Sequence, residues 1–187
     1  VDIGSGNVRI STLDGKRVQR GPTKVTWDIS HVQKEGYPHF MIKEIMEQPK
    51  SLRQTMSERI EQGKVVFQEL ESLQEKLSDS KRINRIILLG CGTAYHAGLV
   101  GKYLLEKLVQ TPVEVDMSSE FRYSSPLITP ETLVIAVSQS GETADTLASV
   151  RYARNHGATV IAICNVVGSS ITREVDATIH THAGPEI

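Results

Sequence analysis

The second half of the chain alternates short apolar runs with segments of helical periodicity. The apolar runs predict strands, and the amphipathic segments between them predict helices. The continuous apolar run 133–137 predicts a central strand, because such a run is typical of a strand with both faces buried. The predicted strands are residues 85–89, 113–117, 133–137, 159–164 and 177–180, and the predicted helices are residues 94–109, a short segment near 120 and residues 143–155. This alternation predicts an α/β fold whose five-stranded parallel sheet is covered by helices on both faces.

The first 80 residues follow a different pattern. Asp14-Gly15 is a hairpin signal between residues 8–13 and 16–20, and residues 24–27 predict a further strand. Strands this few and this short do not bury a core of their own. We therefore interpret residues 1–30 as a β remnant at the edge of another domain.

Helical patterns follow this remnant. The first begins at residues 40–46, and Pro49 is expected to end it or to open the next helix. Another helical segment is predicted at residues 65–77. Methionines and leucines at helical spacing are usually core residues, so we expect these helices to pack on the sheet domain. Their apolar stripes comprise Leu52, Thr55, Met56 and Ile60, and then Phe67, Leu70, Leu73 and Leu77.

Composition narrows the class of protein. The chain has 187 residues, of which 23% are charged, and its net charge of −1 argues against a nucleic-acid partner. No apolar run approaches the roughly 20 residues that span a bilayer, so no membrane span is expected. Cys91 and Cys164 each follow an apolar run, which is more typical of reduced thiols than of a disulfide scaffold. We expect a cytoplasmic protein.

The hexapeptide at residues 138–143 is the main candidate site. It joins the predicted central strand to a helix and brings together Ser138, Gln139, Ser140, Gly141 and Thr143. Unpaired N–H groups and the positive dipole end of a helix favour an anion. The loop has no lysine and lacks the GxxxxGK[ST] pattern of nucleoside triphosphate sites. The pattern therefore predicts a site for a single phosphate on a small, hydroxyl-rich molecule.

Simple capping is the alternative interpretation of this loop. Ser and Thr are common N-cap residues, and Ser-Gly is an ordinary turn. Capping explains one hydroxyl but not three together with a glutamine. We expect Glu142 to lie in the first helical turn, where it complements the dipole and points away from a bound ligand.

A second cluster, Gly90-Cys91-Gly92-Thr93, follows the first strand of the sheet. It begins like the dinucleotide fingerprint GxGxxG, with Asp116 or Glu120 as a possible ribose-binding acid, but Tyr95 replaces the third glycine. We expect this loop to lie beside residues 138–143 and to enclose one small phosphorylated ligand. A helix N-terminus also lowers the pKa of a thiol, so a catalytic Cys91, with His96 close in sequence, stays an alternative.

Histidines suggest a metal site only weakly. His180 and His182 lie two residues apart on a strand-like segment with no carboxylate between them, and His156 is distant in sequence. We therefore expect no metal.

Five motifs together resemble the glutamine–fructose-6-phosphate aminotransferase family, the glucosamine-6-phosphate synthases. The motifs are GCGTAYHAG at 90–98, SSEFRY at 118–123, SQSGETADT at 138–146, ICNVVGSSITRE at 163–174 and HAGPEI at 182–187. The resemblance covers essentially the whole chain. In that family an N-terminal glutaminase domain precedes two copies of the SIS (sugar isomerase) fold. It implies that residues 1–30 end the glutaminase domain, residues 31–80 form linker helices and residues 81–187 form the first SIS copy.

The resemblance also implies a function and a set of site residues. The family makes glucosamine 6-phosphate from fructose 6-phosphate and glutamine without a metal or redox cofactor, and a homodimer is expected. The matching positions are Cys91, Gly92 and Thr93 on one wall and Ser138, Gln139, Ser140, Gly141 and Thr143 on the other. Ala94 departs from the family, because many members have serine there.

We expect this chain to bind fructose 6-phosphate without catalysing the reaction. Val1 is not the cysteine that serves the family as glutaminase nucleophile, and the chain ends at Ile187, before the second SIS copy that carries the isomerase residues. The expected partners are a glutaminase domain and that second copy. A non-catalytic SIS module that senses a phosphosugar is the alternative function.

Overall fold

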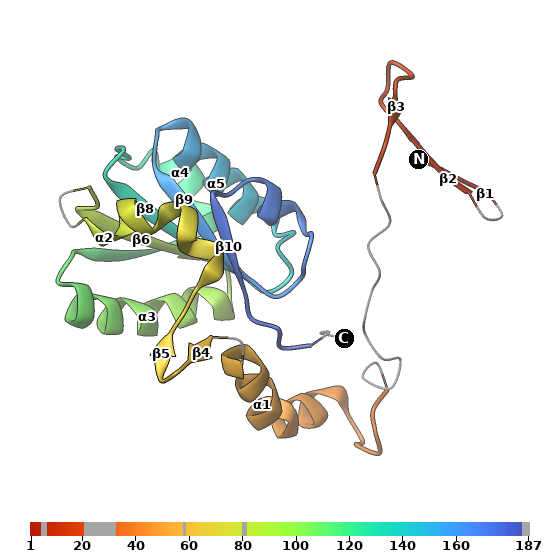
Figure 1. The fold of residues 1–187 in the computed structure, drawn as a ribbon, viewed down its shortest axis with the longest axis horizontal. Helices are drawn as coiled ribbons and strands as arrows, with labels where there is room; N and C mark the ends of the chain where they lie inside the picture. Colours follow the sequence, from red (N-terminus) through yellow and green to blue (C-terminus); the bar gives the residue numbers. More distant parts are fainter. Residues whose placement is uncertain (5–6, 21–32, 58, 80–81, 185–187) are drawn as a thin grey trace.

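A five-stranded parallel sheet forms the centre of residues 82–184 (Figure 1). The computed structural model describes residues 1–4, 7–20, 33–57, 59–79 and 82–184. The strands are β6 (Arg85–Gly90), β7 (Val113–Met117), β8 (Thr132–Ser138), β9 (Thr159–Cys164) and β10 (Ala177–His180), in the order β10-β9-β8-β6-β7. All four strand pairings are parallel, and β8 is central. The predicted fold is confirmed.

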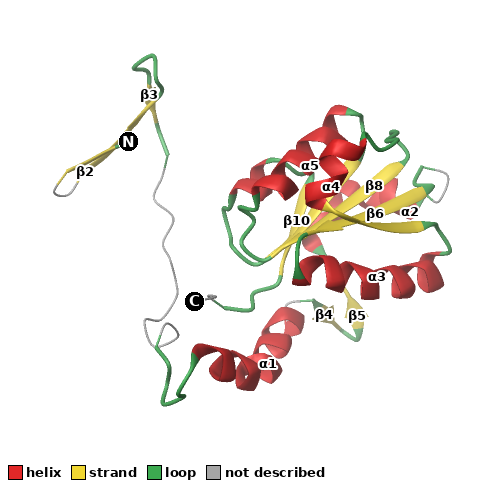
Figure 2. Ribbon diagram, turned by 180° about the vertical axis from the view of Figure 1, so that it is seen from behind, coloured by secondary structure: helices red, strands yellow, loops and turns green. Residues whose placement is uncertain are grey.

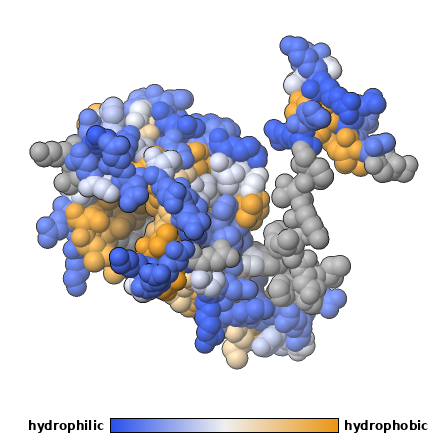
Figure 3. Space-filling view, in the orientation of Figure 1, coloured by the Kyte–Doolittle hydropathy of each residue, from blue (hydrophilic) through white to orange (hydrophobic). Residues whose placement is uncertain are grey.

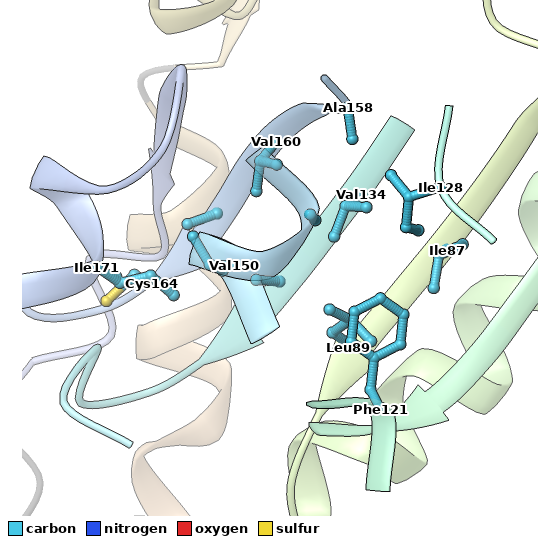
Figure 4. Packing of buried hydrophobic residues seen from close by; sticks show 13 residues of the cluster. Ile87, Leu89, Phe121, Ile128, Val134, Val150, Ala158, Val160, Cys164 and Ile171 are labelled. Carbon is cyan, nitrogen blue, oxygen red and sulfur yellow. The ribbon is translucent and has the colours of Figure 1, made fainter. Parts of the chain in front are cut away.

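Two apolar cores form because successive strand residues point to opposite faces of the sheet. Ile87, Leu89 and Val134 lie in the core that Figure 4 shows, together with Phe121 and Val150. Those last two residues come from helices α4 (Ser118–Ser124) and α5 (Ala144–Asn155). A short 3-10 helix, η3 (Ser170–Arg173), also contributes to this core.

The opposite core lies under a different set of helices. It contains Ile86, Leu88 and Leu133 from the sheet, with Leu105 of α3 (Thr93–Val109) packed against them. η2 (Gln68–Leu73) and α2 (Gln74–Ser78) cover the same face and supply Leu70, Leu73 and Leu77. Helices thus cover both faces of the sheet (Figure 2).

The N-terminal strands form a small antiparallel sheet of their own. β2 (Asn7–Ser11) pairs with β3 (Arg17–Val18) around the predicted Asp14-Gly15 turn, so the hairpin is confirmed. β1 (Asp2–Gly4) pairs with β2 and was not predicted. The strand predicted at 24–27 lies outside the described residues.

Pro49 does not interrupt its helix. α1 (Phe40–Ser57) runs through it, because a proline removes one N–H donor while the turns on either side keep their own bonds. The expected break was therefore wrong. Ile60 is not helical either: it lies in β4 (Ile60–Glu61), which pairs with β5 (Lys64–Val65) across the Gln62-Gly63 turn. Because β5 occupies residues 64–65, helical structure begins only at Gln68 rather than at 65.

The apolar stripe of α1 is not buried, contrary to expectation. Met41, Met46 and Leu52 have 74%, 60% and 61% of their surface exposed. Polar residues instead attach α1 to the sheet domain, because Ser51 and Thr55 donate hydrogen bonds to the carbonyls of Ala183 and Thr181. Leu70, Leu73 and Leu77 of the second predicted stripe do pack on the sheet. Phe67, predicted to belong to the same stripe, is instead 36% exposed and lies against the Arg59 guanidinium.

Candidate functional site

The two candidate loops lie side by side at one edge of the sheet. β6 and β8 are hydrogen-bonded neighbours, with Leu89 opposite Ala136. After β6 the chain continues to β7 on one side, whereas after β8 it continues to β9 on the other. Ligands of open α/β sheets bind where the strand order reverses in this way, beyond the carboxyl ends of the strands. The predicted proximity of residues 90–93 and 138–143 is confirmed.

Serine hydroxyls hold the β8–α5 loop from within. The backbone N–H of Gly141 donates to Ser138 Oγ at 3.0 Å, and that of Glu142 donates to Ser140 Oγ at 3.2 Å. Both hydroxyls accept in these bonds, so each keeps its own O–H to donate. Ser138 Oγ also lies 3.5 Å from Thr143 Oγ1. The loop therefore gathers hydroxyl donors at the start of α5.

Thr143 is the N-cap residue of α5, but its side chain makes no cap hydrogen bond. The Thr143 hydroxyl therefore does not cap the N-terminus of α5. The first N–H groups of an α-helix lack intrahelical acceptors, and the dipole there is positive. The start of α5 is accordingly suited to an anion, and hydroxyls rather than lysine surround it.

Gly141 fits a position where a side chain does not. Its φ is +66°, and a Cβ atom there would lie 2.2 Å from Ser169 Oγ and 2.8 Å from Cys164 Sγ. The loop is also tied to the segment after β9, because the N–H of Ile171 donates to the Gly141 carbonyl and that of Asn165 to the Gln139 carbonyl. These bonds fix the loop before any ligand arrives.

Glu142 lies one residue before the N-cap of α5 and not in its first turn, where Asp145 is the acidic residue. That part of the prediction was wrong. The Glu142 carboxylate instead accepts the N–H of Ser170 at 2.7 Å, at the start of η3. This hydrogen bond lowers the pKa of Glu142 below its ordinary value. The short segment between Ser138 and α5 leaves Glu142 facing η3.

The β6–α3 loop is equally tight. A Cβ atom at Gly90 would lie 2.8 Å from the backbone of Ala94 and Tyr95, so the first turn of α3 presses on the strand end. Gly92 precedes the helix with φ of +57°. The Cys91 thiol lies 4.0 Å from the Thr146 hydroxyl, which donates to Ser118 Oγ. Cys91 therefore faces the start of α5 and α4.

A cavity of about 460 Å³ opens at the same edge of the sheet. Of the predicted site residues, Thr93, Ser138 and Gln139 line it. Cys91, Gly92, Ser140, Gly141 and Thr143 lie in the same two loops but not on its wall. The remaining wall comprises Glu44, Glu47, Ser51, Ala94, Ala97, Val137, Ile163, Asn165, Thr181, Ala183 and Gly184.

Several of these wall residues were missed by the sequence analysis. Asn165 directly follows β9, and a polar residue at a strand's carboxyl end is a usable signal. Its Oδ1 accepts from Thr181 Oγ1 and from the Ala183 N–H, and its Nδ2 donates to the Gly184 carbonyl. The α1 residues carry no comparable signal, because only the fold brings them to the sheet edge.

The histidines do not assemble into a cluster. The rings of His180 and His182 lie 5.9 Å apart, while His156 caps the far end of α5. Burial lowers the pKa of His180. Among the described residues, no three His, Cys, Asp or Glu side chains are placed to share a metal ion. Nor does any helix in the described ranges have the length and apolarity to cross a membrane.

Residues 77–187 match the family model described as the SIS domain. The chain belongs to the SIS domain family. The matched residues contain the five-stranded parallel sheet and both loops at its edge.

The SIS domain and the residues before it are similar to named relatives. The chain is 53% identical over 180 residues to the glutamine–fructose-6-phosphate aminotransferase [isomerizing] of Clostridium tetani, covering 96% of this chain and 29% of the relative. Identity to the Clostridium acetobutylicum enzyme of the same name is 48%, covering the whole chain and 30% of that protein. The chain thus spans less than a third of the length of these relatives.

A solved structure is similar too. The C-terminal domain of glucosamine-fructose-6-phosphate aminotransferase from Francisella tularensis superposes with a TM-score of 0.75 at 38% identity. The superposition covers 83% of this chain and 42% of that one. The resemblance to this aminotransferase family is confirmed.

Proposed function

We propose that this SIS domain binds fructose 6-phosphate, with the phosphate at the start of α5. The observation that carries the proposal is the β8–α5 loop: the N-cap Thr143 makes no side-chain cap bond, and Ser138 and Ser140 keep their O–H groups to donate. Helix N–H groups and hydroxyls together bind an anion without a cation.

The sugar would extend from the phosphate into the cavity. Thr93 and Gln139 line it and offer a hydroxyl and an amide to sugar hydroxyls. In this arrangement Cys91 and Gly92 shape the turn that presents Thr93, and Gly141 shapes the opposite loop. Backbone bonds from Asn165 and Ile171 hold that loop in place, so little ordering is needed on binding.

The chain would act as one part of a longer aminotransferase. Its relatives carry that name and are about three times its length. In the whole protein, residues 1–30 would close a glutaminase domain, residues 31–80 would be the linker and residues 81–187 the first SIS copy. A second copy and a homodimer would complete the site, where fructose 6-phosphate and glutamine yield glucosamine 6-phosphate. Alone, this chain would bind the sugar phosphate and not convert it.

An NMR titration of this chain with fructose 6-phosphate tests the proposal. Amide shifts are expected at residues 91–93 and 138–143, and fructose without phosphate is expected to cause none of them. The Ser138→Ala plus Thr143→Ala double variant should lose the shifts because two of the hydroxyl donors are gone. Glu142→Gln is the matched control: it lies in the same loop but bonds to η3, so it should bind as the original chain does.

Other outcomes would favour other functions. Shifts with NAD and none with fructose 6-phosphate would contradict the proposal and support a nucleotide site at residues 90–95. Binding of several phosphosugars with no turnover in the complete protein would instead support the sensing module. Equal shifts in the double variant and in Glu142→Gln would show that the hydroxyls do not form the site.

A further inference from the structure

The chain that leaves β10 forms part of the cavity wall after the strand has ended. β10 pairs with β9 as far as His180, opposite Cys164, and the Thr181 N–H still donates to the Cys164 carbonyl. Residues 181–184 then run toward α1 outside any helix or strand (Figure 1). The sheet no longer pairs their backbone groups, and such groups need other partners where water is excluded.

The Asn165 side chain supplies those partners. Its Oδ1 accepts from Thr181 Oγ1 at 3.0 Å and from the Ala183 N–H at 2.8 Å, and its Nδ2 donates to the Gly184 carbonyl at 2.6 Å. The amide thus uses both its acceptor and its donor on one short segment. An amide that bonds to three residues of the same segment leaves that segment little freedom to move.

His182, in the middle of this segment, has a left-handed backbone with φ of +50°. Such a conformation costs free energy in a residue other than glycine, and it persists only where the surroundings over-determine it. The bonds from Asn165 to Thr181 and Ala183 lie directly on either side of His182. The Asn165 side chain therefore holds the turn that the segment makes.

The backbone of Asn165 is bonded to another part of the cavity wall. Its N–H donates to the Gln139 carbonyl at 3.1 Å. Gln139 and residues 181, 183 and 184 all line the cavity. Asn165 thus joins two walls, one through its backbone and one through its side chain. A side-chain substitution should accordingly release residues 181–184 and leave the β8–α5 loop bonded as before.

We propose that Asn165 is a positioning residue, whose side chain fixes residues 181–184 as a preformed wall for the sugar part of the ligand. The inference rests on the proposed function, because it takes the phosphate to lie in the β8–α5 loop and the sugar in the cavity. A preformed wall binds more tightly than one that is ordered only on binding. Loss of the side chain weakens contacts to the sugar and spares those to the phosphate.

Asn165→Ala tests the inference with two ligands, each followed by NMR amide shifts. Affinity for fructose 6-phosphate should fall by about 3- to 10-fold, roughly the contribution of one hydrogen bond. The shifts that inorganic phosphate causes at residues 138–143 should keep their midpoint concentration, because the backbone bonds to that loop remain. In the ligand-free chain, hydrogen exchange at the Ala183 amide should become faster, since this N–H loses its acceptor.

Asn84→Ala is the matched control. Asn84 is exposed and lies just before β6, at the opposite edge of the sheet, so both ligands should bind this variant as they bind the original chain. Asn165→Asp keeps the two accepted bonds and replaces only the donor that faces Gly184. It should show the same difference between the two ligands, and it is the variant to measure if Asn165→Ala does not melt cooperatively.

Three results would overturn the inference while the proposed function stands. They are an unchanged affinity of Asn165→Ala for fructose 6-phosphate, a similar loss for both ligands, and unchanged exchange at Ala183. Each leaves the proposed function intact as long as the original chain binds fructose 6-phosphate through residues 138–143. If the original chain does not bind this sugar phosphate, both proposals fail together.

Discussion

At the scale of single residues, Gly141 constrains the candidate site most. Two independent constraints require glycine at this position: the backbone is left-handed, and a Cβ atom would have no space beside Ser169 and Cys164. Gly168, in the loop before η3, shares the left-handed backbone, with φ of +73°, but a Cβ there would meet nothing within 4 Å. Substitutions at Gly141 and at Gly168 therefore separate the free-energy cost of backbone strain from the cost of steric overlap within one domain.

Gly141→Ala should destabilise the domain by about 2 to 5 kcal/mol, because a left-handed non-glycine residue costs about 1 to 2 kcal/mol and overpacking costs about 1 to 3 kcal/mol. Gly168→Ala should cost only the backbone part, about 1 to 2 kcal/mol. Urea unfolding followed by circular dichroism measures both changes. Equal losses would show that Ser169 and Cys164 move aside, and that the loop is less fixed than its hydrogen bonds indicate.

At the scale of elements, the link between α1 and β10 depends on Arg59. This residue comes just after α1 and is about nine-tenths buried. Its guanidinium donates to the His180 carbonyl, pairs with Glu69 at 3.0 Å and lies 5.0 Å from the ring centre of Phe67. One side chain thus connects the β4–β5 region, η2 and the last strand of the sheet.

Arg59→Ala should therefore cost about 2 to 3 kcal/mol, because hydrogen bonds to a charged, mostly buried group are among the stronger ones. Arg59→Lys should recover only part of this, since an ammonium group lacks the planar fork that reaches two acceptors. Arg53→Ala, on the exposed side of α1, is the control and should change stability by less than about 0.5 kcal/mol. A thermal melt in which all three variants match the original chain would contradict this role.

At the scale of the whole molecule, apolar surface is left exposed along α3. Val100, Tyr103, Leu104 and Leu108 lie at helical spacing with 62%, 73%, 58% and 76% of their surface exposed. Figure 3 shows hydrophobic surface at the lower left of the sheet domain, where Figure 1 places α3. Contiguous apolar patches on soluble proteins commonly mark interfaces.

We expect this chain to self-associate through the α3 surface. Leu104→Lys plus Leu108→Lys should shift it toward a monomer of 20.6 kDa, because two buried ammonium groups would oppose association. Sedimentation velocity at several concentrations measures the change. Leu127→Lys, at an equally exposed leucine outside α3, should leave the association as it was. A monomeric original chain would contradict the expectation outright.

The sequence by itself determined the sheet and the two loops. Hydrophobic runs such as 133–137 are strong local signals, because a strand buried on both faces needs every side chain apolar. The loops at 90–93 and 138–143 followed from these strands, since the carboxyl ends of parallel strands share one edge. Ser138 and Ser140 accept from N–H groups two or three residues further on, which is a local constraint, whereas Gly141 is confined by Ser169 and Cys164, which are distant in sequence.

Only the tertiary structure decided what completes the cavity. Local periodicity predicts neither that α1 continues through Pro49 nor that Glu44 and Glu47 line the cavity. The position of α1 at the cavity depends on hydrogen bonds between residues more than 120 positions apart, such as Thr55 to Thr181 and Ser51 to Ala183. Sequence patterns report the preferences of neighbours along the chain, whereas these contacts exist only once the sheet has formed and its edge is available to α1.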